Sequence, residues 1–257
     1  MEKAVKLRNC IISLVYMCAV MTCFQARADG GPEFVFEAGT SNKSIQFSTI
    51  DGGTGNPVNY SAKIVTLDYA GTVLYRNFYT RLKLSQSIKD DVVYDTVKGD
   101  VLFMSRSDLD LTLGYYIGGG VSAFIGHKRG EFEANVAVDV SSPDKNVRAG
   151  FIDSGIFAGM SYSVPLEEST VSLNFAYAKL DGEIDIAFPG ATASTSGDTT
   201  GFSYSASWSK PITDSTSFTV ALNVIRYELD DTALLLGTVM DTKQDFDAIS
   251  VALVHYF

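Results

Sequence analysis

Alternation between apolar and small polar side chains is the feature of this sequence that most limits its fold. Phe202, Tyr204, Ala206 and Trp208 share one parity, and serines occupy the odd positions of 203–209. A period of two places successive side chains on opposite faces of a β-strand. The polar face carries Ser, Gly and Thr rather than the Lys and Glu of a sheet that faces water. Such a face suits a narrow, crowded interior.

The alternation recurs along the chain, in the segments 109–117, 156–164, 171–178 and 249–257. After the first 28 residues, no stretch approaches the roughly 18 continuous apolar residues of a membrane-spanning helix. Yet 46% of the chain is hydrophobic. This apolar material must therefore be spread over short, alternating strands, with one apolar face each.

Division of the chain by these segments and by turn residues predicts ten strands. They lie near 33–48, 60–70, 74–88, 107–117, 119–128, 150–164, 169–181, 200–210, 216–229 and 246–257. The connections alternate between short ones, at 71–73, Gly118, 165–168 and 211–215, and long ones, at 49–59, 89–106, 129–149, 182–199 and 230–245. Short turns at one end and long loops at the other are typical of a transmembrane barrel.

The first 28 residues read as a secretory signal peptide. Lys3, Lys6 and Arg8 precede the apolar run Ile11–Phe24, and Ala26-Arg27-Ala28 supplies a small-x-small cleavage pattern. The run of 14 residues is shorter than the roughly 20 that a transmembrane helix needs. We therefore expect an exported protein with two segments, a signal peptide at 1–28 and one barrel domain at 29–257.

Removal of the predicted signal peptide changes the cysteine content and the net charge of the chain. All three cysteines lie within residues 1–28, so residues 29–257 contain neither a disulfide nor a thiolate metal ligand. Removal of this segment takes away four basic residues and one acidic residue, which changes the net charge from −10 to −13. A field of this sign repels polyanions, so nucleic acid is not an expected partner.

The last strand carries a resemblance to a known class. Residues 249–257 alternate and end on Phe257, as in the closing strand of outer-membrane β-barrel proteins, whose terminal aromatic is read by the barrel-assembly machinery. His255 stands where that class more often has Tyr. The chain resembles small OmpA-like, OmpX-like and OmpW-like barrels, without a particular subfamily. The fold this implies is an all-β, up-and-down antiparallel transmembrane β-barrel of a Gram-negative outer membrane.

Ten strands are the expected count, with eight or twelve as alternatives. The segment 92–104 would supply an extra hairpin in the twelve-stranded case. Each arm of that hairpin has only about five residues, whereas a tilted spanning strand needs roughly 9–11. We therefore interpret this segment as part of an extended loop.

Several charged residues fall on the face that the alternation assigns to the interior. They are Glu37, Asp68, Arg81, Lys83, Asp110 and Asp153. Opposite charges in a narrow lumen pair, because a lone buried charge is costly. A packed polar core is favoured over a solute-selecting constriction, since ten-stranded barrels are closer in size to filled barrels than to open porins.

Apolar clusters fall in the predicted external loops. Three such segments are 101–104, 184–188 and 233–236, and their proposed interaction residues are Phe103, Ile186, Phe188, Leu234, Leu235 and Leu236. Exposed apolar clusters are costly unless something covers them. Extension of the strands beyond the membrane is favoured; a plug, a protein contact and an entrance for a hydrophobic solute are the alternatives.

Catalysis has few candidate residues. The two histidines are His127 and His255, and omptin proteases, which are ten-stranded barrels, place Asp and His at the outer rim. No paired-carboxylate motif like theirs accompanies His127, and no nucleophile elbow, phosphate loop or metal-ligand cluster is evident. The expectation is no catalytic residue, no cofactor and no metal site.

The sequence thus favours a non-enzymatic outer-membrane barrel with a structural or surface-interaction, adhesion-like role through long external loops. A narrow porin-like channel for small or hydrophobic solutes is the alternative, and an outer-membrane hydrolase is third. The expected partners are outer-membrane lipid and lipopolysaccharide, the barrel-assembly machinery, and a surface protein or small solute.

Overall fold

A computed structural model describes residues 31–50, 57–88, 91–94, 101–137, 147–188, 190–234 and 238–257. Contacts divide the chain into two units, Met1–Pro32 and Glu33–Phe257. The predicted signal peptide lies outside the described residues, and the second unit contains every strand. Within the described ranges there is no helix with the length and apolarity needed to cross a membrane.

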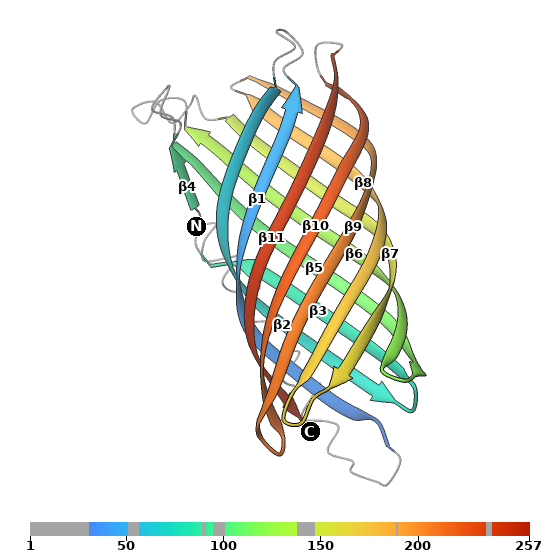
Figure 1. Ribbon diagram of the computed structural model, residues 1–257. Helices are drawn as coiled ribbons and strands as arrows, with labels where there is room; N and C mark the ends of the chain where they lie inside the picture. Colours follow the sequence, from blue (N-terminus) through green and yellow to red (C-terminus); the bar gives the residue numbers. More distant parts are fainter. Residues whose placement is uncertain are drawn as a thin grey trace. The chain divides into compact units, whose positions relative to one another are not determined.

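The second unit is a ring of antiparallel strands (Figure 1). The strands of the described residues are β1 (Glu33–Ile50), β2 (Pro57–Tyr75), β3 (Phe78–Ser87), β4 (Asp91–Tyr94), β5 (Val101–Gly118), β6 (Val121–Ala137), β7 (Val147–Pro165), β8 (Thr170–Phe188), β9 (Ala191–Thr213), β10 (Thr216–Leu234) and β11 (Thr238–Tyr256). Strands that follow one another in the sequence pair with each other, except β3 and β4; β1 pairs with β11, and β3 pairs directly with β5. The result is a closed ten-stranded barrel, as predicted.

The short strand β4 stands outside this ring. It pairs with the outer part of β5, from Met104 to Val101, and its four residues are too few to span a membrane. The described residues 91–94 and 101–104 therefore form a short antiparallel pair, where the sequence favours a loop. Because β3 bypasses β4 and pairs directly with β5, the short pair adds no strand to the barrel.

Four tight connections define one end of the barrel, which we call the turn end. They lie at Arg76–Asn77, Gly119–Gly120, 166–169 and 214–215. The first predicted turn, at 71–73, is wrong, because Gly71 continues β2 and pairs with both Phe36 and Leu82. The reversal instead occurs at Arg76, whose φ of 55° suits a two-residue hairpin turn.

The connections at the opposite end, the loop end, are shorter than predicted. Only six residues separate β1 from β2, two separate β8 from β9, and three separate β10 from β11. The predicted long loops at 182–199 and 230–245 are mostly strand, and strands β1 and β2 extend into both ends of the predicted loop at 49–59. Phe103, Ile186, Phe188 and Leu234 therefore lie in strands, which is the favoured strand extension; Leu235 and Leu236 lie outside the described residues.

The outer face of β8 shows where the apolar belt stops. Leu173, Phe175 and Tyr177 are exposed apolar residues, and the next outward positions are Lys179 and Asp181. The strand has 19 residues, about twice the 9–11 that a tilted strand needs to cross a bilayer. The outer half of the barrel therefore projects beyond the belt, toward the loop end.

Candidate functional site

The predicted interior charges lie on the lumen side of the wall. Glu37 accepts a hydrogen bond from Arg81 at 2.7 Å, between β1 and β3. Asp68, 5% exposed, accepts hydrogen bonds from the hydroxyls of Ser41, Thr66 and Ser85. These contacts join strands β1, β2 and β3 inside the barrel. The structure thus gives Asp68 hydroxyl partners rather than a cation.

The other three predicted charges lie nearer to the middle of the barrel. Lys83 and Asp110 occupy directly opposed positions of β3 and β5, and both line one cavity. Asp153 is fully buried, and Oδ2 of Asp153 is 3.7 Å from the Arg106 guanidinium. The six residues therefore form four local groups rather than one continuous network: Glu37 with Arg81, Asp68 with its hydroxyl partners, Lys83 opposite Asp110, and Asp153 beside Arg106.

Four buried charged residues form what we call the charged layer: Lys43, Arg106, Asp108 and Lys128. Asp108 lies at its centre, and the alternation pattern did not single it out. Asp108 receives Nζ of Lys43 at 2.9 Å and Nη2 of Arg106 at 2.7 Å, and Nζ of Lys128 lies 4.0 Å away. All four side chains are at most 13% exposed. Three cations thus converge on one buried carboxylate, where pairing must offset the cost of desolvation.

Two cation–π contacts connect the charged layer to the opposite wall of the lumen. The Arg106 guanidinium on β5 lies 4.3 Å from the ring centre of Phe246 on β11, and Lys128 on β6 lies 5.8 Å from the ring centre of Tyr227 on β10. Each pair of strands is separated by several others in the ring. Side chains therefore bridge opposite walls at this level, and cation–π attraction is stronger for such desolvated groups.

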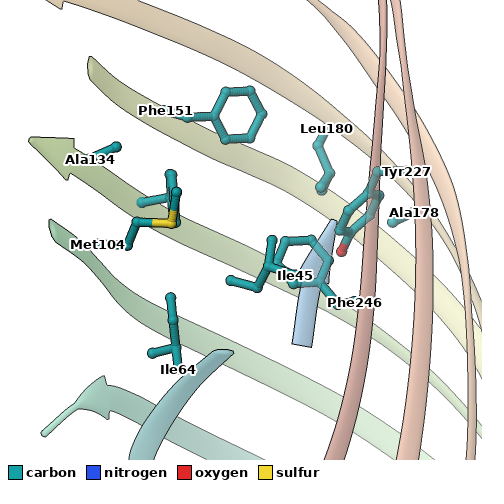
Figure 2. Close-up of a cluster of buried hydrophobic side chains, with 10 residues drawn as sticks. Ile45, Ile64, Met104, Ala134, Phe151, Ala178, Leu180, Tyr227 and Phe246 are labelled. Atoms are coloured by element: carbon teal, nitrogen blue, oxygen red, sulfur yellow. The ribbon is translucent and has the colours of Figure 1, made fainter. Parts of the chain in front are cut away.

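A layer of packed apolar side chains fills part of the lumen (Figure 2). Along their strands, Ile45, Met104 and Phe132 lie nearer to the loop end than Lys43, Arg106 and Lys128 do. Ile45 on β1 and Phe151 on β7 belong to one contact cluster although their strands lie on opposite sides of the ring. The cluster comprises Ile45, Ile64, Met104, Phe132, Ala134, Phe151, Ala178, Leu180, Tyr227 and Phe246, all at most 8% exposed. The lumen is therefore filled with side chains at this level.

A cavity of about 220 Å³ remains within the charged layer. Four cations and two carboxylates contribute to its lining: Lys43, Lys83, Arg106, Lys128, Asp108 and Asp110. The facing wall combines apolar side chains with uncharged polar ones: Phe124, Phe157, Ala176 and Ala178 with Asn174, Ser203, Ser205 and Asn223. The cavity is thus lined by charged groups on one side and by a mixture of apolar and uncharged polar groups on the other.

Neither histidine belongs to this cavity. His127 is exposed on the outer face, where Nε2 of His127 is 3.5 Å from Oγ of Ser154. His255 contacts Thr216 at 3.0 Å and packs on the ring of Phe257 at the turn end. In the described part of the chain, no three His, Cys, Asp or Glu side chains group closely enough to hold a metal ion.

The additional charges share the parity of residues that the alternation did identify. Lys43 follows Glu37 and Ser41 on the inward positions of β1, and both Arg106 and Asp108 precede Asp110 on β5. The predicted loop at 89–106 concealed Arg106, whereas Lys43, Asp108 and Lys128 lie within predicted strands and were not singled out. Continuing the alternation toward the loop end would have identified them.

Comparison with solved structures concerns the fold alone, because the identities are low. The outer-membrane protease OmpT from Escherichia coli superimposes with a TM-score of 0.59 at 10% identity, over 88% of this chain and 96% of that chain. The translocator domain of the autotransporter NalP from Neisseria meningitidis gives 0.49 at 10% identity, over 97% and 96%. Neisserial surface protein A gives 0.41 at 7% identity, over 88% and 99%.

The chain has the fold of an outer-membrane β-barrel. No protein-family model matches the sequence, and no curated protein matches it. The fold comparison rests on OmpT, which has the highest of these three scores. In outer-membrane barrels of known orientation the short turns are periplasmic and the long loops are extracellular.

Proposed function

We propose that this protein is a closed, non-enzymatic outer-membrane barrel that acts through its extracellular end, in a structural or surface-interaction role. The observation that carries the proposal is the filled lumen. Among the described residues, ion pairs, cation–π contacts and an apolar layer join opposite walls, which supports a closed lumen over a porin-like channel. The projecting outer half of the strands is what remains available to partners.

The outer face of this projection is charged and internally paired. Lys179 faces Asp198 at 3.7 Å, Arg226 faces Asp247 at 2.8 Å, and Lys243 donates to Glu228 at 2.9 Å. The paired charges keep the protruding wall hydrated. We propose lipopolysaccharide and a second surface protein as partners there. At the periplasmic end, exposed Phe257 is proposed as the contact for the barrel-assembly machinery.

The closed lumen makes a direct prediction for planar bilayers. The inserted wild-type protein should pass no steady current, because the apolar layer excludes water and ions. A variant that combines Phe132→Gly with Phe151→Gly removes two aromatic rings from that layer. It should give measurable channel openings in the same bilayers, and it therefore serves as the positive control for insertion and detection. A steady ohmic current from the wild type would refute the closed barrel and favour the alternative of a narrow channel.

The surface role predicts that the protruding hairpin is separable from the barrel. Leu229 and Thr242 are directly opposed in β10 and β11, so Asn-Gly can replace residues 230–241 as a two-residue turn. The shortened protein should still insert, because its belt is intact, but cells that display it should lose the autoaggregation or adherence that the full-length protein confers. Equal attachment by cells with full-length, shortened or no protein would contradict a surface-interaction role.

A further inference from the structure

We propose that the lumen cavity binds a small zwitterion of the amino-acid class. Its carboxylate pairs with Lys83, its ammonium pairs with Asp110, and an apolar side chain packs on Phe124 and Phe157. This site goes beyond the surface role, since it lies inside the barrel and is built from groups that the closed architecture does not use.

The first argument is a pair of opposite charges that do not meet. Lys83 and Asp110 are directly opposed across β3 and β5, and both line the cavity. No ion pair joins them among the described residues, and Oδ1 of Asp110 is buried without a hydrogen-bond partner. Burial of polar groups without partners is costly. Asp110 is also directly opposed to Lys128 on β6, again with no ion pair between them, so neither Lys83 nor Asp110 has a direct ion-pair partner among the described residues.

The second argument is the charge balance of the surroundings. The cavity is lined by four cations and two carboxylates, and the buried Asp68 and Asp153 bring the cluster to four of each sign. A ligand with a net charge would leave one buried charge uncompensated. A zwitterion supplies both of the missing partners and keeps the cluster neutral.

The third argument is the shape and chemistry of the facing wall. Phe124 and Phe157 pack edge to face, with ring centres 6.2 Å apart, and Ala176 and Ala178 leave space beside them. The volume of about 220 Å³ corresponds to about seven water molecules at roughly 30 Å³ each. A single amino acid with an apolar side chain matches this size; a peptide does not.

The proposed route of entry is from the turn end of the barrel. Tyr227 and Phe246 belong both to the lining of the cavity and to the apolar cluster, so they close it toward the loop end. On the other side the lining continues as small polar residues, among them Ser203 and Ser205. The ligand would therefore arrive from the periplasm and would not cross the apolar layer.

Isothermal titration calorimetry of the detergent-solubilised full barrel tests the site. The probes are L-phenylalanine, 3-phenylpropanoate, which lacks the ammonium, and 2-phenylethylamine, which lacks the carboxylate. L-phenylalanine should bind saturably at one site, and each analogue should bind at least tenfold more weakly. No saturable binding of L-phenylalanine, or equal affinity for 3-phenylpropanoate, would overturn the proposal.

Two substitutions assign the groups. Lys83→Met should weaken L-phenylalanine at least tenfold and leave 2-phenylethylamine unchanged, whereas Asp110→Asn should weaken L-phenylalanine and leave 3-phenylpropanoate unchanged. Lys179→Met, on the outer face, is the control and should change nothing. If a single variant does not fold, the exchange of Lys83→Asp with Asp110→Lys keeps both charges in the cavity and should bind L-phenylalanine. Wild-type affinity in both single variants, or no binding by a folded exchange variant, would refute the assignment.

Discussion

Asp108→Asn should lower the free energy of unfolding by about 3–5 kcal/mol, the usual cost of removing one partner from a buried ion pair. The side chain is 8% exposed and compensates Lys43 and Arg106 directly. The amide cannot neutralise them, so two buried cations lose their main counter-charge. Urea unfolding of the barrel in lipid vesicles measures the change, with the fluorescence of Trp208, the single tryptophan, as the signal.

An exposed ion pair provides the matched control for this variant. Asp245 lies 3.6 Å from Arg226, and both side chains are more than 40% exposed. Asp245→Asn should therefore change the free energy of unfolding by no more than about 1 kcal/mol. The double variant Arg106→Met with Asp108→Leu should lose less free energy of unfolding than the sum of the losses of Arg106→Met and Asp108→Leu made singly. The reason is that the double variant removes both charges of the ion pair. Equal losses for Asp108→Asn and Asp245→Asn would show that the charged layer is not needed to hold the barrel closed.

Gly126→Val should prevent stable folding, with a loss of at least about 3 kcal/mol. A Cβ atom at this inward position of β6 would overlap the ring of Phe157 and the carbonyl oxygen of Leu111. The carbonyl belongs to the paired strand β5 and cannot move without breaking the register. The yield of folded barrel after refolding from urea, followed by its unfolding midpoint, measures the effect.

Gly150→Val on β7 is the control for added volume. The Cβ of Gly150 would meet nothing closer than Asp185 at 4.0 Å, and its backbone has no positive φ. Valine should therefore be tolerated there, as is usual for a β-branched residue on an exposed strand. If both glycine variants refold with the same yield, the close packing of the lumen wall at Gly126 is disproved.

Local alternation along the chain is enough to determine the class of fold. A period of two assigns each side chain to one face of a strand, and this depends only on backbone geometry. Ten strands, the outward apolar belt and the inward parity of Asp68, Lys83 and Asp110 can all be inferred in this way. The end of β2 cannot, because Ala70-Gly71-Thr72 has turn composition but continues a paired strand.

The loop-end half of the strands does not follow the same pattern, because apolar and polar side chains exchange faces there. On β8, Tyr177 faces outward and Ala178 inward within the belt, whereas Asp181 faces outward and Leu180 inward beyond it. Outside the bilayer the outer face meets water and the lumen is filled by apolar packing. A pattern of apolar residues outside and small polar residues inside therefore predicts loops where these parts of the strands lie.

The sequence by itself determined that strands of this kind must close into a barrel with one face toward lipid, because no other arrangement satisfies their backbone groups in a membrane. Only the tertiary structure decided what fills the barrel. The pairing of β3 with β5 closes the ring, and closure brings Arg106 to Phe246 and Lys128 to Tyr227 across the lumen. Such contacts depend on the diameter and stagger of the closed ring, which a local period of two does not specify.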